Sequence, residues 1–351
     1  MANKSSTNFV AIPPGATIKE QLIDRNMSQK EFAVRMNLSE KHISKLINGE
    51  VQLTYETANK LEMVLGIPAR FWNNLEAIYR ENLIKVETEK EMEDDIEIAK
   101  HIPYSEMVHY GWIASANKAI EKVENLRKFF EVTTLSLLGN NQLTKIACRL
   151  LAVTEKSDLA LMVFVQKAKI ESRSLPTKHV NLTGLNKLIP ELRSMTKLDP
   201  NIFCPLLQEK LADNGIALVF LPHLKGSYLH GATFAYGSKI VVGMTVRGKD
   251  ADKFWFSLFH ELAHIVLGHI DQEDGLNDKD EKDADQWAAN TLIPDAIFES
   301  FKHTNDFSKN SVLRFAKEQN IDPGIVVGRL QTEHAIEFNK LNHLKTQYSL
   351  H

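Results

Sequence analysis

The sequence contains only two cysteines, Cys148 and Cys204, among 351 residues. Such a low number excludes a disulfide framework, and the distance between the two excludes a Cys-x-x-Cys metal site. Any zinc site must therefore be built mainly from His and carboxylate side chains. The near absence of cysteine also fits a reducing cytoplasm, which is the compartment that we expect.

Long apolar runs are absent as well. No stretch of about 20 apolar residues could cross a bilayer, and the first residues lack the apolar run of a signal peptide. We therefore expect no membrane contact and no secretion. The net charge of −3 gives no overall attraction to nucleic acid, so any DNA binding must depend on a local group of residues. Length and a hydrophobic content of 43% indicate a globular protein of two or three domains.

The strongest motif lies in the apolar stretch from Phe254 to His269, which contains His-Glu-x-x-His. Its composition predicts a buried helix, on which His260 and His264 stand one turn apart and point the same way. Glu261 lies beside them. Because polar groups in an apolar core need a compensating partner, the pattern predicts a zinc site with Glu261 next to the metal.

A catalytic zinc needs a third protein ligand, and the segment from Glu281 to Pro294 offers one. Helical spacing places Glu281 and Asp285 on one face, next to a buried stripe made of Ala284, Trp287, Ala288 and Leu292. We assign Glu281 as the third ligand and Asp285 as the acceptor of the free N–H of a ligating histidine. Asp283 is the alternative ligand, about 200° round the helix from Glu281.

These motifs, together with the segment from Phe315 to Arg329, resemble the ImmA/IrrE group of metallopeptidases over residues 201–335. The resemblance implies that His260, His264 and Glu281 hold zinc and that Glu261 is the catalytic base. It also implies a gluzincin-like domain. Three strands are predicted before the zinc helix, at 216–221, 232–236 and 239–246, as a small antiparallel sheet with a hairpin turn at Gly237-Ser238.

The N-terminal part predicts a bundle of short helices in residues 15–83. Ser28, Ser39 and Thr54 are expected N-caps, and Gly49 and Gly66 are expected helix ends. Two short helices joined by a tight turn make a helix-turn-helix. The alternative is a packing module without a nucleic-acid partner.

The segments "Met-Ser-Gln-Lys-Glu-Phe-Ala" and "Ser-Glu-Lys-His-Ile-Ser-Lys-Leu-Ile-Asn-Gly" resemble the HigA-type antitoxins among the XRE-like repressors. The N-terminal part of the second helix of such a motif reads base edges in the major groove of an operator. The residues nominated for DNA contact are Ser39, Glu40, Lys41, His42, Ser44 and Lys45, with Gln29 and Lys30 for phosphates. Residues 17–83 hold nine basic and nine acidic residues, so the domain has no overall positive charge.

The remaining segments are predicted as follows. Residues 1–14 form a flexible arm, and residues 336–351 form a tail. Residues 84–200 form an acidic hinge and a helical middle region, and the acidic segment 84–100 is either a solvated helix or a hinge at a domain boundary. Four side chains near the expected strands, His223, Tyr228, His230 and Tyr236, are candidates for polarising a carbonyl. His269 is expected at the surface.

The fold class that follows is α+β, mostly α. The predicted function is that of a DNA-binding transcriptional regulator with a zinc endopeptidase domain, which cleaves a specific regulator, a toxin or itself in a stress, toxin-antitoxin or phage-related response. A homodimer is expected. The alternative is a non-proteolytic HigA-like antitoxin or repressor that uses the peptidase fold to sense or bind a partner. In a third alternative, Cys204 occupies the open zinc position.

Overall fold

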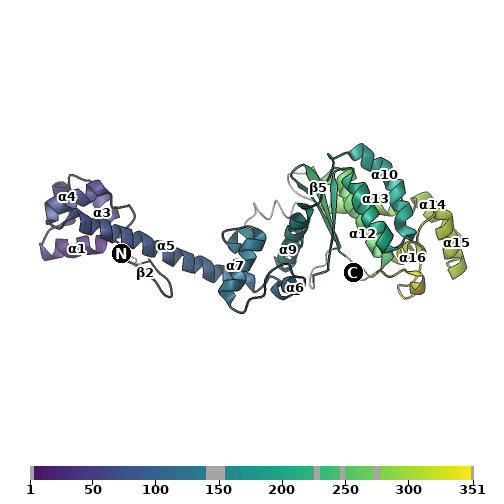
Figure 1. The fold of residues 1–351 in the computed structure, drawn as a ribbon, viewed down its shortest axis with the longest axis horizontal. Coiled ribbons are helices and arrows are strands. Elements are labelled where there is room, and N and C mark those ends of the chain that lie inside the picture. Colours follow the sequence, from purple (N-terminus) through teal and green to yellow (C-terminus); the bar gives the residue numbers. More distant parts are fainter. Residues whose placement is uncertain (1–3, 140–154, 225–229, 246–249, 272–276, 349–351) are drawn as a thin grey trace. The chain divides into compact units, whose positions relative to one another are not determined.

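The computed structural model describes residues 4–139, 155–224, 230–245, 250–271 and 277–348 (Figure 1). They fall into two compact units, Met1–Glu97 and Ile98–His351. Helices dominate both units and strands are few, so the α+β, mostly α class is confirmed. None of the helices in the described ranges has the length and apolarity needed to span a bilayer.

Four short helices form the core of the N-terminal unit: α1 (Gly15–Asp24), α2 (Gln29–Met36), α3 (Glu40–Asn48) and α4 (Tyr55–Leu65). The side chains of Ser28, Ser39 and Thr54 each accept a backbone N–H in the first turn of the helix that follows, as the sequence predicts. Each such cap contributes about 1 kcal/mol. The apolar faces meet in one core made of Ile18, Phe32, Met36, Ile43, Leu46, Leu61 and Trp72.

The acidic segment after these helices is helical. It forms the second half of α5 (Ala69–Ala99), which is 31 residues long. The expected flexible arm differs from the structure, because β1 (Lys4–Ser5) and β2 (Val10–Ala11) pair as an antiparallel hairpin. In the hairpin turn, the Thr7 hydroxyl donates a hydrogen bond to Glu93 of α5 and the backbone N–H of Asn8 donates one to Glu89. Ala11 is fully buried in a small cluster with Tyr79 and Val86.

The second unit begins with the helices α6 (Tyr104–His109), α7 (Ala119–Phe130), η1 (Leu135–Gly139), α9 (Glu155–Ser172), α10 (Leu182–Ser194), η2 (Met195–Lys197) and α11 (Pro200–Ala212). The sequence places α9 and α10 in a middle region. In the structure α10 contributes Leu185 and Leu192 to the same hydrophobic core as the zinc-motif helix, and α9 packs on the sheet. The core of the C-terminal domain therefore extends well before residue 201.

The sheet has three strands in the order β3-β5-β4, with β3 at Ile216–Leu221, β4 at Gly231–Tyr236 and β5 at Lys239–Thr245. The strand positions and the Gly237-Ser238 hairpin agree with the prediction, but the antiparallel prediction is wrong for β3, which pairs with β5 in parallel. Both strands are nearly continuous apolar runs, which is typical of strands buried on both faces.

Helices cover both faces of the sheet (Figure 1). The helix α9 lies on one face, where a Cβ on Gly243 would come within 2.9 Å of Phe164, so glycine permits the close approach. The other face packs against α12 (Ala251–Val266), the helix that carries His-Glu-x-x-His. After the short η3 (His269–Asp271), α13 (Asp278–Leu292) packs along α12.

The domain ends with α14 (Asp295–His303), α15 (Lys309–Gln319), α16 (Pro323–Thr332) and η4 (Asn342–Leu344). The residues predicted as a tail are part of the fold as far as Tyr348. This tyrosine is 3% exposed, and its hydroxyl accepts a hydrogen bond from Trp255 Nε1 at 2.8 Å. Lys345 Nζ forms a buried ion pair with Asp252 of α12 at 2.7 Å. The last described residues therefore anchor α12.

Candidate metal centre and DNA-binding face

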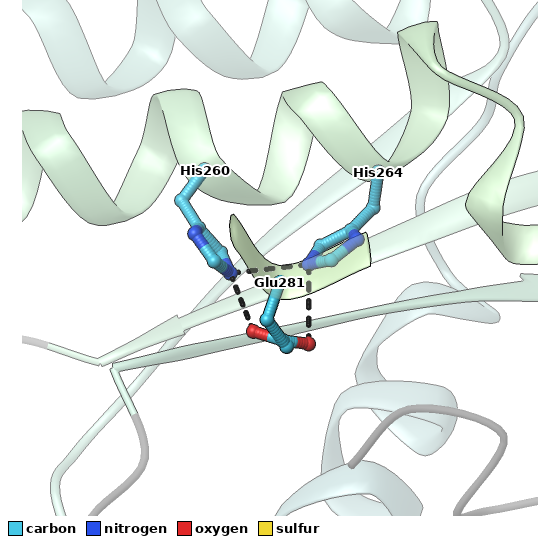
Figure 2. A group of neighbouring side chains, drawn as sticks. All are labelled: His260, His264 and Glu281. Atoms are coloured by element: carbon cyan, nitrogen blue, oxygen red, sulfur yellow. Dashed lines mark hydrogen bonds and ion pairs between the residues drawn. The ribbon is translucent and has the colours of Figure 1, made fainter. Parts of the chain in front are cut away.

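Two neighbouring helices bring the three predicted zinc ligands together (Figure 2). On α12, His260 Nε2 and His264 Nε2 lie 3.1 Å apart. Glu281, in the first turn of α13, places one oxygen 3.2 Å from His260 Nε2 and the other 3.7 Å from His264 Nε2. Two ligands of a tetrahedral zinc are separated by about 3.3 Å, so the three donors are spaced for one small cation.

The carboxylate of this cluster is only partly satisfied by the described residues. Glu281 Oε1 is buried and accepts no hydrogen bond from the described residues. Burial and the neighbouring His260 lower the pKa of His264, so this ring is neutral. Burial also opposes a charge on His260, but hydrogen bonds to Asp285 and Glu281 outweigh it and raise the pKa of His260 to about 10. The donor set therefore fits a divalent cation, which would satisfy Glu281 and both rings together.

Asp285 lies where the sequence places it, with Oδ1 at 2.8 Å from His260 Nδ1. A proton on Nδ1 shared with this carboxylate leaves the lone pair of Nε2 directed to the cluster. The alternatives do not join the group. Asp283 is exposed, and Cys204 is half-buried against the hydrophobic core, where burial and Asp199 raise the pKa of its thiol to about 11.

Glu261 is almost completely enclosed between α12 and the sheet. Its side chain is 8% exposed, and Oε2 accepts a hydrogen bond of 2.6 Å from the Thr233 hydroxyl of β4. Gly231 makes room for it, because a Cβ there would lie 2.6 Å from Glu261 Oε1. Burial raises the pKa of Glu261 to about 7, close to the value that suits a general base at neutral pH.

A cleft of about 1200 Å³ opens at this cluster. Its walls come from α12, α13, α16 and the C-terminal segment, and include His230, His260, Glu261, Asp285, Arg329, Phe338 and Lys345. Of the other candidates for polarising a carbonyl, Tyr236 accepts a hydrogen bond from Arg173, the backbone oxygen of His223 accepts one from Tyr110, and Tyr228 lies outside the described residues. His230 alone of these lines the cleft.

His269 is not at the surface, contrary to the prediction. The side chain is 7% exposed, and its Nδ1 lies 3.1 Å from His264 Nδ1. The chain turns at Gly268, whose φ is +75°, and returns the next residue towards α12. A left-handed glycine directly before a histidine is the local signal for this reversal.

On the N-terminal unit, α3 presents a polar face. Its apolar residues Ile43, Leu46 and Ile47 are buried. Of the residues nominated for DNA contact here, His42 is half-buried. The others are exposed: Ser39, Glu40, Lys41, Ser44 and Lys45. Gln29 and Lys30 are exposed at the start of α2. The side-chain oxygen of Ser39 already accepts the backbone N–H of His42.

Comparison with known proteins connects both regions to families. Residues 18–72 match the helix-turn-helix family HTH_3, and residues 215–330 match the family Peptidase_M78, described as an IrrE N-terminal-like domain. A relative, the uncharacterized HTH-type transcriptional regulator YddM of Escherichia coli (strain K12), is 40% identical over 63 residues, which are 18% of this chain and 67% of that protein.

The chain is an HTH-type protein with an IrrE-like M78 domain. The resemblances to XRE-like helix-turn-helix proteins and to the ImmA/IrrE group are thereby confirmed, while the HigA-type antitoxin likeness stays a prediction. The M78 region runs from β3 to α16 and contains the whole cluster of His260, His264 and Glu281. The HTH_3 region contains α2 and α3 with all the residues nominated for DNA contact.

Proposed function

We propose that this chain is a DNA-binding transcriptional regulator whose M78 domain is a zinc-dependent endopeptidase acting on a particular regulator or toxin protein, or on the chain itself. The observation that carries the peptidase half is the position of Glu261. A buried carboxylate beside a cluster of three metal-ligand atoms, facing a large cleft, is more than a structural metal site requires.

In this proposal His260, His264 and Glu281 hold the metal. When bound, zinc lowers the pKa of a water and polarises a peptide carbonyl. Glu261 takes the proton of the attacking water on its carboxylate and passes it to the nitrogen of the leaving amine. Thr233 fixes the orientation of that carboxylate by donating to Oε2 at 2.6 Å. Asp285 keeps the proton of His260 on Nδ1, away from the metal.

The position of the sheet favours an extended polypeptide as the substrate. The strand β4 is at an edge of the sheet, and its residues Gly231 and Thr233 lie against Glu261. A segment that adds to such an edge uses main-chain hydrogen bonds, and it would run past the catalytic carboxylate. In this proposal, a folded protein would be cut only at an exposed strand or linker, because the substrate must be extended.

The DNA half rests on α3, whose exposed polar residues would contact base edges while Gln29 and Lys30 contact phosphates. A homodimer belongs to the same proposal, since two recognition helices on one operator bind two half-sites one helical turn apart. Sedimentation of the protein bound to a DNA fragment with two half-sites gives the mass of the complex and tests the dimer. A single chain on each fragment would exclude the dimer.

The test of the peptidase half compares the zinc-loaded protein with Glu261→Gln. Each is incubated with candidate regulators and toxins and by itself, and fragments are identified by mass spectrometry. We expect one defined cut with wild type and with the control Asp283→Ala, and none with Glu261→Gln. Absence of any Glu261-dependent fragment would favour the alternative, a repressor or antitoxin that uses the domain to bind a partner.

A further inference from the structure

The two histidines of the cluster are supported in different ways. His260 Nδ1 contacts the Asp285 carboxylate directly at 2.8 Å. His264 is 2% exposed, and its Nδ1 faces a third histidine, His269, at 3.1 Å. Two ring nitrogens at this distance share one proton, so one must donate and the other must accept. Which of the two donates decides whether His264 can bind a metal.

A second carboxylate lies on the far side of His269. Asp280 is 7% exposed, and its Oδ1 is 3.8 Å from His269 Nε2, an ion-pair contact. Its other oxygen, Oδ2, accepts the backbone N–H of Asn277 at 3.0 Å, while the Asn277 side chain accepts the N–H of Asp280. This capping box fixes the carboxylate in the first turn of α13, one residue before Glu281.

The negative charge of Asp280 favours the tautomer of His269 with its proton on Nε2, the nitrogen nearer to the carboxylate. In that tautomer His269 Nδ1 is a bare acceptor, so the shared proton belongs to His264 Nδ1. His264 Nε2 then carries a lone pair directed to His260 and Glu281. In the opposite tautomer a proton would sit on His264 Nε2 and occupy the place of the metal.

We propose that His269, backed by Asp280, is a positioning residue that holds His264 in its metal-binding tautomer. The inference rests on the proposed function, because it assumes that His264 is a ligand. His269 is not itself a ligand: it contacts His264 on Nδ1, whereas the nitrogen of His264 that faces His260 and Glu281 is Nε2. Each metal-binding histidine is thus supported by a different carboxylate of α13, His260 directly and His264 through His269.

The experiment measures zinc affinity of the full-length protein by competition with a chromophoric chelator. His269→Leu fills a similar volume without a hydrogen bond and should weaken zinc binding by roughly 10 to 100-fold. His269→Gln keeps an acceptor oxygen towards His264 and a donor N–H towards Asp280, and should restore affinity to within a few-fold of wild type. The absorption spectrum of the cobalt(II)-loaded Gln variant should match that of wild type.

A second pair of variants covers the case in which His269→Leu does not fold. Asp280→Asn keeps the capping oxygen but loses the charge, and it should bind zinc several-fold more weakly. Asp278→Asn, an exposed acid of the same turn, is the matched control and should leave the affinity unchanged. Urea unfolding of each chelator-treated variant shows that the metal-free fold is intact.

The outcomes separate the two proposals. A wild-type protein that binds no zinc would overturn the proposed metal centre. A wild type that binds zinc while His269→Leu or Asp280→Asn binds it equally well overturns only the role of His269. Equal losses for the Leu and Gln variants would also overturn it, because the hydrogen-bonding groups would then contribute nothing.

Discussion

Glu261→Gln should stabilise the metal-free M78 domain at high pH but hardly at low pH. Burial raises the pKa of Glu261 from 4.5 to about 7, so the folded protein binds this proton more tightly than the unfolded chain does. A carboxyl group with a raised pKa adds to the free energy of unfolding when it is protonated. This contribution is fully present below pH 4.5 and is lost as the pH rises through 7. At about 1.4 kcal/mol for each pH unit between the two pKa values, ionised Glu261 costs about 3 kcal/mol.

Glutamine is neutral at every pH and can still accept the Thr233 hydroxyl. The variant should therefore be more stable than wild type by about 3 kcal/mol at pH 8, and by less than about 1 kcal/mol at pH 5. Both proteins are unfolded in urea with a chelator present. Trp72→Phe serves as the background, so that Trp112, Trp255 and Trp287 report on the second unit alone.

Glu318→Gln, an exposed glutamate of α15, is the control and should show no such difference. A stability difference for Glu261→Gln that is the same at both pH values would refute the argument, since it would mean that the carboxylate is not ionised at a cost in the folded protein.

Three further outcomes follow from the same contacts. Asp285→Ala should lower zinc affinity by roughly 10 to 100-fold in a chelator competition, because the His260 tautomer loses its acceptor, and Asp283→Ala should not. Lys41→Ala or Lys45→Ala should weaken operator binding in a fluorescence titration, with a salt slope shallower by about 1 if the lost contact was to phosphate. Tyr348→Phe should cost about 1 kcal/mol in urea unfolding and Tyr348→Ala about 3 kcal/mol; equal costs would mean that the bond from Trp255 is the whole contribution.

The local patterns of the sequence were sufficient for the geometry of the candidate site. Residues four apart on one apolar helix placed His260 and His264 together, and helical spacing on the next helix placed Glu281 and Asp285 on the side that faces them. Capping residues predicted the ends of the short N-terminal helices, which are determined by hydrogen bonds within one turn.

Features that depend on long-range contacts were missed. The direction in which β3 pairs with β5 cannot be inferred from its sequence, because an apolar run is compatible with parallel and with antiparallel pairing. His269 is polar and follows a glycine, so its burial depends on the packing of α13, which lies further along the chain. Residues 345–348 are polar or aromatic without a clear period, and only their contacts with Asp252 and Trp255 make them part of the core.

In the proposed metal centre, His260, His264 and Glu281 hold one zinc ion beside the carboxylate of Glu261. Elemental analysis of the purified full-length protein tests it directly, with His260→Ala, Glu281→Ala and Glu261→Gln measured in parallel. We expect one zinc per chain in wild type and in Glu261→Gln, and a large loss in both ligand variants. Full zinc content in both His260→Ala and Glu281→Ala would contradict the assignment of the metal centre.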